Sequence, residues 1–422
     1  MTLTQSFRSE TLAALCAADG EFLLAARYWT GGFRLECGPD VVALRLEDGV
    51  AEAGDPGRDA PGVATLSAPP EIWTQLTAAK PPRFFNDVAN LIGAGVMILK
   101  ADGVLFAQYY PAVMRAVELL RPANPGAGVA RVPTTTIGAF DSPIGRYVHL
   151  DLEGQEHRVY FEEAGQGIPL LLQHTAGCHG SQWRHLFECR EITNHFRLIA
   201  YDLPFHGKSM PPVGPKWWAS EYKLTASFLR SVPLALSAAL GLGRPVFMGC
   251  SVGGVLALDL ARHHPGAFRA VVSLEGGLKI GQDIETLGAL WHPQVSNEYK
   301  ARLMNALMSP TSPEAYRKET SQVYAAGWPP AFLGDLHYYL VDYDLTEEAQ
   351  EIDTRKIAVH ILSGEYDSSG TLEHGQAAHA AISGSTWSAM NDVGHFPMSE
   401  NPEVFLTHLL PVLETIRSMP GA

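Results

Sequence analysis

The chain has 422 residues, of which 46% are hydrophobic and 18% are charged, a composition typical of folded domains and not of disordered segments. Because globular domains commonly span about 100–200 residues, this length predicts two or three of them. The 31 Lys and Arg residues are outnumbered by 45 Asp and Glu residues, which gives a net charge of −14. A protein that grips a phosphate backbone needs a positive face, so we expect no nucleic-acid partner.

Membrane insertion, secretion and disulfide bonding are not expected either. No apolar run approaches the roughly 20 residues that cross a bilayer. The N-terminal stretch carries Glu10 and Asp19 and lacks the basic start and apolar core of a secretory signal. The five Cys residues are scattered without a C-x-x-C pair, which argues against a disulfide framework and a zinc site. We therefore expect a cytoplasmic protein.

Residues 1–122 are predicted to form a small α+β module. The predicted elements are a helix, three strands and three helices, at Ser6–Ala17, Phe33–Cys37, Val41–Glu47, Gly62–Leu66, Pro70–Thr77, Phe84–Ile92 and Tyr109–Leu119. With Trp73 on a helix and Gly93-Ala94-Gly95-Val96 ahead of Gly103-Val104-Leu105, the module resembles a sterol-carrier-protein-type domain. That resemblance implies an apolar tunnel for a lipid or acyl chain. The alternative is a packing module or a homodimer contact without a ligand.

Residues 123–143 are predicted to be a linker. Pro125, Gly126, Gly128 and Pro133 interrupt both helical and strand periodicity in this stretch. The residues before it suffice for a small core of their own, and residues 144–422 then make one large domain.

The large domain shows the alternation of strands and helices that is typical of an open, mostly parallel α/β sheet. A hairpin is predicted first, at Tyr147–Leu152 and Arg158–Glu163. Short apolar runs then recur at Pro169–Gln173, Phe196–Tyr201, Pro245–Met248, Ala270–Leu274 and Ile357–Leu362. Such runs suit strands buried on both faces, and helical patterns lie between several of them. The sequence therefore predicts an α/β fold with helices on both faces of the sheet.

A helical cap is predicted at about residues 277–355, where the rhythm is interrupted. Three helical patterns fall in it, at Asn297–Met308, Pro313–Tyr324 and Pro330–Val341. A long insertion at the carboxyl edge of a sheet commonly covers the site. Four aromatic residues, three of them from this cap, are predicted to contact substrate: Trp183, Trp291, Trp328 and Tyr338.

The motif that decides the chemistry is Gly249-Cys250-Ser251-Val252-Gly253, a G-x-S-x-G. It follows a predicted strand directly and precedes a helical run. A Ser on so tight a turn is tolerated when small residues flank it, and the turn raises its hydroxyl above the sheet edge. The context makes Ser251 the predicted nucleophile.

A Ser hydroxyl needs a base, and the base needs an acid that fixes its tautomer. His395 is the predicted base, because it lies in a late loop between a predicted strand and the C-terminal helix. Asp367 is the predicted acid, in the loop after the Ile357–Leu362 strand. Glu275, which ends the strand after the nucleophile helix, is the alternative acid, and Glu365 is a further rival.

The predicted oxyanion hole combines two backbone amides. One belongs to Val252, directly after the nucleophile. The other is expected in the small-residue loop His174–Gly180, with Ala176 favoured and Thr175 next. Removal of one such donor costs roughly 100–1000-fold in turnover in hydrolases.

Taken together, these segments resemble the α/β-hydrolase superfamily over about residues 145–420. The resemblance is carried by PLLLQHTAGCHGSQWRHL, YDLPFHGKS, GCSVGG, SGEYD and VGHFPMSENP, in that order. Thr175 and Phe205 depart from the pattern, since each stands where the family usually has Gly. The resemblance implies the order Ser251, Asp367, His395 for the catalytic groups.

The predicted activity is hydrolysis of a carboxylic ester, thioester or lactone of a medium-sized, largely apolar substrate through an acyl-enzyme. No metal or organic cofactor is expected. The same three groups also serve carbon–carbon hydrolysis of a diketone-like ring-cleavage product, which is the alternative reaction. An inactive lipid-binding carrier or receptor is the alternative from another class.

Overall fold

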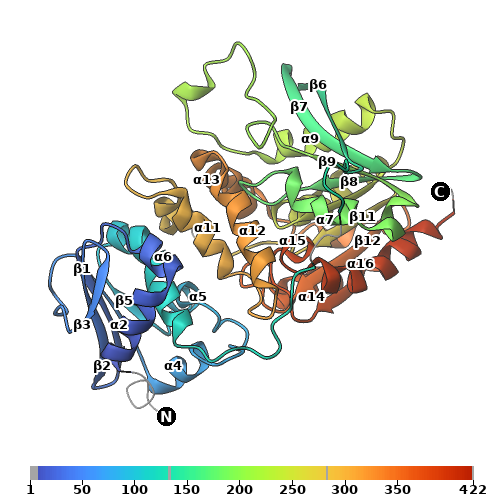
Figure 1. Cartoon of the computed structure of the whole chain (residues 1–422). Coiled ribbons are helices and arrows are strands. Elements are labelled where there is room, and N and C mark those ends of the chain that lie inside the picture. Colours follow the sequence, from blue (N-terminus) through green and yellow to red (C-terminus); the bar gives the residue numbers. More distant parts are fainter. Residues whose placement is uncertain (1–7, 132–134, 282–283, 421–422) are drawn as a thin grey trace. The chain divides into compact units, whose positions relative to one another are not determined.

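The computed structural model describes residues 8–131, 135–281 and 284–420, and the chain divides into two compact units (Figure 1). The first unit comprises residues 1–128 and 289–306, and the second comprises residues 129–288 and 307–422. Parts of the predicted module, linker and cap lie outside the described residues, at 1–7, 132–134 and 282–283.

The first unit is built around a five-stranded sheet within the described residues, in the order β3-β2-β1-β4-β5. Its strands are β1 (Gly31–Cys37), β2 (Asp40–Glu47), β3 (Val50–Ala53), β4 (Val63–Ala68) and β5 (Ile98–Lys100). Its helices are α2 (Ser9–Ala18), α3 (Gly20–Ala25), α4 (Pro70–Leu76), α5 (Val88–Gly93), α6 (Gly103–Leu119) and α11 (Asn297–Asn305). β1 pairs in parallel with β4, and the other neighbours are antiparallel. β3 and β5 were not predicted, because they are short and largely exposed.

Two tryptophans anchor the core of this unit. The Trp29 indole stacks on Tyr109 at 4.7 Å between ring centroids and donates a hydrogen bond of 2.8 Å to the Gly62 carbonyl. The Trp73 indole donates a hydrogen bond of 2.8 Å to the carbonyl of Glu36, a residue of β1. A buried indole N–H needs such a partner, and both are satisfied by strand-end carbonyls. The apolar residues of the module therefore form its own core.

Helix α11 packs against α6 in the first unit, although the sequence places this segment in the cap of the large domain. Arg302 joins α11 to that unit, 2.7 Å from Glu118 and 3.5 Å from Asp87. Tyr299 meets Tyr110 edge to face at 5.7 Å. Helical periodicity predicts α11 itself, but it does not identify the core against which the helix packs.

Replacing Arg302 by alanine is expected to lower the free energy of unfolding by about 3–5 kcal/mol, because it leaves the buried Asp87 carboxyl without its cation. The Arg302 side chain is 10% exposed and that of Asp87 is 1% exposed. Urea unfolding measures the loss. Arg355→Ala is the control, since that side chain is 88% exposed and should change little. An unchanged midpoint for Arg302→Ala would show that the ion pairs do not hold α11.

The second unit contains an eight-stranded sheet within the described residues, in the order β13-β12-β11-β10-β8-β9-β7-β6. Its strands are β6 (Ile144–Leu152), β7 (Gln155–Gly165), β8 (Ile168–Gln173), β9 (Phe196–Tyr201), β10 (Val246–Cys250), β11 (Ala270–Leu274), β12 (Ala358–Gly364) and β13 (Thr386–Met390). β6 and β7 form the antiparallel start, and β7 pairs antiparallel with β9. All pairs from β9 to β13 are parallel. The predicted mostly parallel α/β sheet is confirmed.

Helices cover both faces of this sheet (Figure 1). They are α7 (Arg184–Phe187), α8 (Arg190–Thr193), α9 (Ala226–Ala239), α10 (Val252–His263), α14 (Leu372–Ala381), α15 (Pro397–Glu400) and α16 (Pro402–Arg417). One core cluster joins alternate strand residues such as Val246 and Met248 to α16 residues such as Leu409. Helix α10 packs on β10 and β11. Burial on both faces explains the continuous apolar strands.

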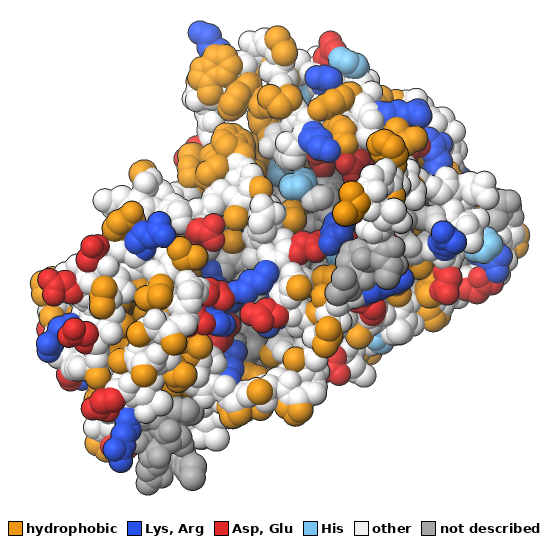
Figure 2. Space-filling view, in the orientation of Figure 1, with side chains coloured by type: hydrophobic (Ala, Val, Ile, Leu, Met, Phe, Trp, Pro, Cys, Tyr) orange, Lys and Arg blue, Asp and Glu red, His pale blue; other side chains and the backbone are white. Residues whose placement is uncertain are grey.

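The segment between α11 and β12 supplies two further helices, α12 (Glu314–Ala325) and α13 (Pro329–His337), followed by a π-helical turn at Tyr338–Asp342. Within the described residues no helix is both long enough and apolar enough to cross a membrane. On the face that Figure 2 shows, acidic and basic side chains are interspersed.

Candidate active site

Ser251 lies at a strained turn between β10 and α10. Its backbone has φ 60° and ψ −114°, a region that residues with a side chain rarely adopt. Close packing fixes the turn, because a Cβ on Gly249 would lie 2.4 Å from the Gly253 carbonyl oxygen. A Cβ on Gly253 would lie 2.7 Å from the Gln173 side chain. Both flanking glycines are therefore required by space, and the strain at Ser251 marks a functional position.

His395 and Asp367 are joined directly. His395 Nδ1 lies 2.7 Å from Asp367 Oδ2, and the carboxylate also accepts the backbone N–H groups of Ser369 at 2.7 Å and Gly370 at 3.0 Å. An Nδ1–H donated to a carboxylate leaves Nε2 as the basic nitrogen of the ring. The Cys250 thiol donates to the His395 carbonyl at 3.1 Å, so the His395 loop lies against the residue that precedes Ser251.

Glu275, the alternative acid, contacts Asp367. Within the described residues it makes no hydrogen bond to His395. It accepts the Gly364 N–H at 2.7 Å and is hydrogen-bonded to Asp367. Complete burial, together with the negative charge of Asp367, raises the pKa of Glu275 well above its ordinary value. Glu275 therefore contacts the Asp367 carboxyl from the side of Gly364, and burial disfavours a negative charge on it.

A third buried carboxyl, Glu400, braces the His395 loop. It accepts the backbone N–H of Gly394 and, at 3.1 Å, that of Ser309. Burial raises the pKa of Glu400 to about 8. Sequence reasoning missed this residue, although a Glu inside the apolar segment around His395 is a usable signal. The His395 N–H is in turn bonded to the Leu307 carbonyl at 2.9 Å.

Of the three predicted oxyanion donors, the backbone N–H groups of Val252 and Ala176 are available to a ligand, and that of Thr175 is already hydrogen-bonded. The Thr175 N–H donates at 3.1 Å to the Gln182 side chain, so it is not available to a ligand. The Ala176 N–H makes no hydrogen bond among the described residues. Val252 is the first residue of α10, whose amide has no partner within the helix.

Asp335 of α13 holds the loop that contains Ala176. Its carboxylate accepts the Gly177 N–H at 2.7 Å, the Tyr222 hydroxyl at 3.0 Å and a 2.8 Å bond from His206 Nε2. Although burial opposes it, the Asp335 charge raises the pKa of His206 above its ordinary value. Sequence reasoning missed Asp335, because nothing in its own segment indicates which loop it meets.

The four predicted substrate aromatics lie in different places. Trp183 is fully buried in the core of the second unit, and Trp291 belongs to the first unit. Tyr338 points to α10, where its hydroxyl donates at 3.0 Å to Asp259. Trp328 stacks on Phe205 at 5.9 Å and lines a cavity of about 570 Å³.

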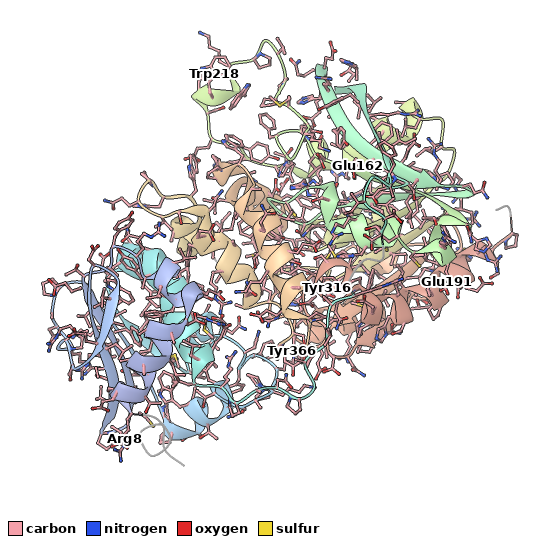
Figure 3. The ribbon with its side chains drawn as sticks, in the orientation of Figure 1. Arg8, Glu162, Glu191, Trp218, Tyr316 and Tyr366 are labelled. Atoms are coloured by element: carbon pink, nitrogen blue, oxygen red, sulfur yellow. The ribbon has the colours of Figure 1, made fainter. Side chains whose placement is uncertain are left out.

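Further aromatic residues surround Trp328. Trp217 and Tyr222 meet it at 5.8 and 6.0 Å. Trp218 lies on the same loop and is 65% exposed; Figure 3 shows it at the far end of that loop. The 570 Å³ cavity is lined by Trp328 and Phe205 but not by Ser251.

Tyr339, the neighbour of the predicted Tyr338, is the aromatic residue that reaches the nucleophile. Its hydroxyl lies close to Ser251 and 3.2 Å from Ser369 Oγ. Burial raises the pKa of Tyr339 above its ordinary value, so the phenol stays neutral. The π-helical turn at Tyr338–Asp342 sets this orientation, and such turns are frequent at functional sites.

The described residues contain no group of three or more His, Cys, Asp or Glu side chains placed to hold a metal ion. The polar groups around Ser251 are instead the His395–Asp367 pair, the buried carboxyls of Glu275 and Glu400, the Tyr339 hydroxyl, and the backbone amides of Val252 and Ala176. That set can move a proton and stabilise a negative oxygen.

Comparisons with known proteins identify the fold. The family model described as alpha/beta hydrolase fold matches residues 168–402. A pimeloyl-[acyl-carrier protein] methyl ester esterase of Vibrio vulnificus (strain YJ016) is 22% identical over 267 residues, covering 60% of this chain and 96% of its own length. A protein of the same name from Methylococcus capsulatus is 28% identical over 264 residues, covering 59% and 93%.

A solved structure shows the same fold. The thermophilic esterase from Thermogutta terrifontis matches with a TM-score of 0.55 at 19% identity, covering 65% of this chain and 100% of that one. The family match spans more than half of this chain and includes the Ser251 turn, Asp367 and His395. The chain therefore belongs to the alpha/beta hydrolase fold family.

Proposed function

We propose that the chain is a serine hydrolase that cleaves a carboxylic ester, thioester or lactone through an acyl-enzyme. The observation that carries the proposal is the strained Ser251 turn next to the hydrogen-bonded His395–Asp367 pair. The methyl ester esterases among the relatives support an ester bond as the target. The substrate is medium-sized and largely apolar.

In the acylation step, Ser251 Oγ attacks the carbonyl carbon while His395 Nε2 takes the hydroxyl proton. The carbonyl oxygen becomes an oxyanion and accepts the N–H groups of Val252 and Ala176. Collapse of this intermediate breaks the bond to the leaving group, and His395 returns the proton to it. Such proton transfer contributes roughly 100–10,000-fold to the rate.

In the deacylation step, water attacks the acyl carbonyl and gives its proton to His395. The same two amides hold the second oxyanion. The carboxylic acid leaves and the proton returns to Ser251 Oγ. The Asp367 carboxylate stabilises the imidazolium, and Glu275 packs against Asp367.

Tyr339 sets the size of the acyl pocket in this proposal. It is 2% exposed and lies on Ser251, and Ser251 itself is only 4% exposed. Bulk water is thus largely excluded from the nucleophile, and space for an acyl chain is limited by the phenol ring. Apolar surroundings of this kind favour apolar substrates.

Replacing Tyr339 by alanine is expected to shift the optimum of hydrolysis toward longer acyl chains, because it removes the ring above Ser251. Rates on nitrophenyl esters of increasing acyl length measure the profile. Tyr338→Phe is the matched control, since that neighbour faces Asp259 and only its hydroxyl is lost. An identical profile for the Tyr339→Ala chain would remove Tyr339 from the acyl pocket.

The proposed activity is tested with the same ester panel on the full wild-type chain. Saturable hydrolysis with one preferred acyl length is the expected result. Hydrolysis no faster than that of the Ser251→Ala chain on every ester and on a matching thioester and lactone would contradict the proposal.

A further inference from the structure

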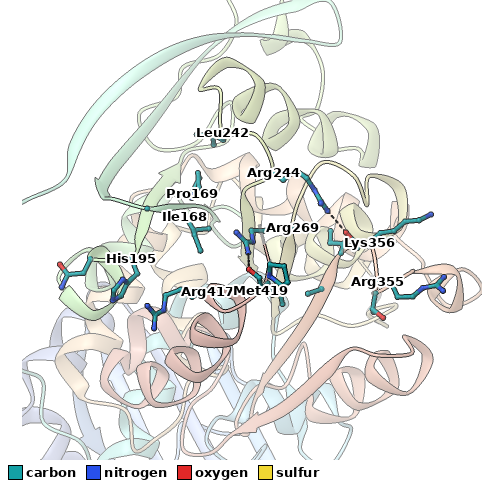
Figure 4. Close-up of a pocket in the computed structure, with 16 residues that line it drawn as sticks. Ile168, Pro169, His195, Leu242, Arg244, Arg269, Arg355, Lys356, Arg417 and Met419 are labelled. Atoms are coloured by element: carbon teal, nitrogen blue, oxygen red, sulfur yellow. Dashed lines mark hydrogen bonds between the residues drawn. The ribbon is translucent and has the colours of Figure 1, made fainter. Parts of the chain in front are cut away.

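A basic cleft lies at the amino ends of β8, β10, β11 and β12, at the edge of the sheet opposite to Ser251 (Figure 4). Its volume is about 950 Å³. Six basic side chains line it: His195, Arg244, Arg269, Arg355, Lys356 and Arg417. They come from several separate segments, which the parallel sheet brings to one edge.

The charged side chains that line this cleft are all basic. Its lining contains no Asp or Glu among the described residues, in a chain whose net charge is −14. Arg355 and Lys356 pair with Asp353, and Arg417 pairs with Glu414; both carboxylates lie outside the lining. Arg244 and Arg269 form no ion pair with any carboxylate of the described residues.

Backbone carbonyls fix the two unpaired arginines without neutralising them. One terminal nitrogen of Arg244 donates to the carbonyls of Phe268 at 2.8 Å and Lys356 at 2.6 Å. One terminal nitrogen of Arg269 donates at 3.2 Å to the Ile416 carbonyl, at the end of α16. Figure 4 draws the Arg244–Lys356 bond and a further bond of 3.4 Å from Arg269 to the Met419 carbonyl. Each guanidinium is thus held in place with its charge intact, a preorganised arrangement for an anion.

The two arginines also repel one another. Burial, together with the positive charge of Arg244, lowers the pKa of Arg269 below its ordinary value. An anion placed between them would relieve this repulsion. The remaining wall is apolar, with Ile168, Leu242, Ile357 and Met419, and suits an organic group attached to the anion.

We propose that this cleft binds a small molecule that carries a di- or triphosphate group, with its phosphates on Arg244, Arg269 and Lys356 and its organic part on the apolar wall. Several cations around one hollow favour a multiply charged group over a single carboxylate. Strand β10 separates the cleft from Ser251 by five residues, roughly 15 Å at the usual strand rise. The cleft is therefore a second site and not part of the acyl pocket.

Isothermal titration calorimetry of the full chain with sodium tripolyphosphate, at constant ionic strength, tests the proposal. One saturable site is expected. Lys356→Glu should weaken binding by at least about tenfold. This side chain is 67% exposed and 3.9 Å from Asp353, so the variant should fold. Lys223→Glu is the matched control, since Lys223 is 56% exposed and 3.8 Å from Glu221, and its affinity should match the wild type.

A second variant and a second anion sharpen the test. Arg269→Gln should also weaken tripolyphosphate binding by about tenfold or more. Citrate at the same ionic strength should bind far more weakly than tripolyphosphate. No saturable binding, equal weakening by Lys223→Glu and Lys356→Glu, or citrate binding as tight as that of tripolyphosphate would each overturn the proposal.

Discussion

Replacing Ser251 by alanine is expected to lower ester turnover by about a millionfold, the loss typical when the nucleophile of a Ser-His-Asp set is removed. No other hydroxyl is positioned on the strained turn between β10 and α10. Alanine has the same backbone cost as serine at φ 60°, so the fold should survive. Initial rates on the preferred nitrophenyl ester measure the loss, and thermal unfolding checks the fold.

Ser227→Ala is the control for this substitution, because Ser227 is exposed on α9 and its hydroxyl bonds only Glu153 within the described parts of the chain. It should leave turnover unchanged. Turnover of the Ser251→Ala chain that stays near the wild-type value would mean that another group attacks the substrate.

Replacing Asp367 by asparagine is expected to lower turnover by about ten-thousandfold, as in other hydrolases of this chemistry. Asparagine keeps the shape but carries no charge, so it neither stabilises the imidazolium nor fixes the Nδ1–H tautomer of His395. The Asp367 carboxylate faces three donors: the backbone N–H groups of Ser369 and Gly370, and His395 Nδ1. The NH₂ group of an asparagine would face at least one of them, donor against donor. Steady-state kinetics on the same ester measure the effect.

Glu275→Gln is the informative comparison, because Glu275 is the other carboxyl near the site. Its side-chain amide can donate to Asp367, and its oxygen still accepts the Gly364 N–H. We therefore expect turnover within about tenfold of the wild type for Glu275→Gln. Retained turnover in Asp367→Asn with a large loss in Glu275→Gln would assign the acid to Glu275.

Much of the second unit could be predicted from the sequence, because local patterns determine it. The buried runs at Phe196–Tyr201 and Ala270–Leu274 coincide with β9 and β11. Parallel strands buried on both faces are continuously apolar, which makes them easy to detect. The Ser251 turn lies between strand and helix because Gly249 and Gly253 permit the close approach there.

What the sequence could not predict depends on contacts between distant segments. Helix α11 was predicted, but its attachment to the first unit depends on Arg302 meeting Glu118 and Asp87. Tyr338 was predicted to contact substrate, but the π-helical turn places its neighbour Tyr339 near Ser251.

The role of residues 1–122 also stays a prediction. The family match begins at residue 168, so it does not reach this module. Its core is closed by residues such as Trp29 and Trp73, which pack on their own sheet and helices.

Reaction of the native full chain with a fluorophosphonate, followed by peptide mapping, tests the central claim most directly. The account predicts one stoichiometric phosphonyl adduct on Ser251, formed faster in the wild type than in the Asp367→Asn chain, and accompanied by loss of ester hydrolysis. Absence of an adduct on Ser251, or full hydrolysis by a chain labelled there, would contradict it.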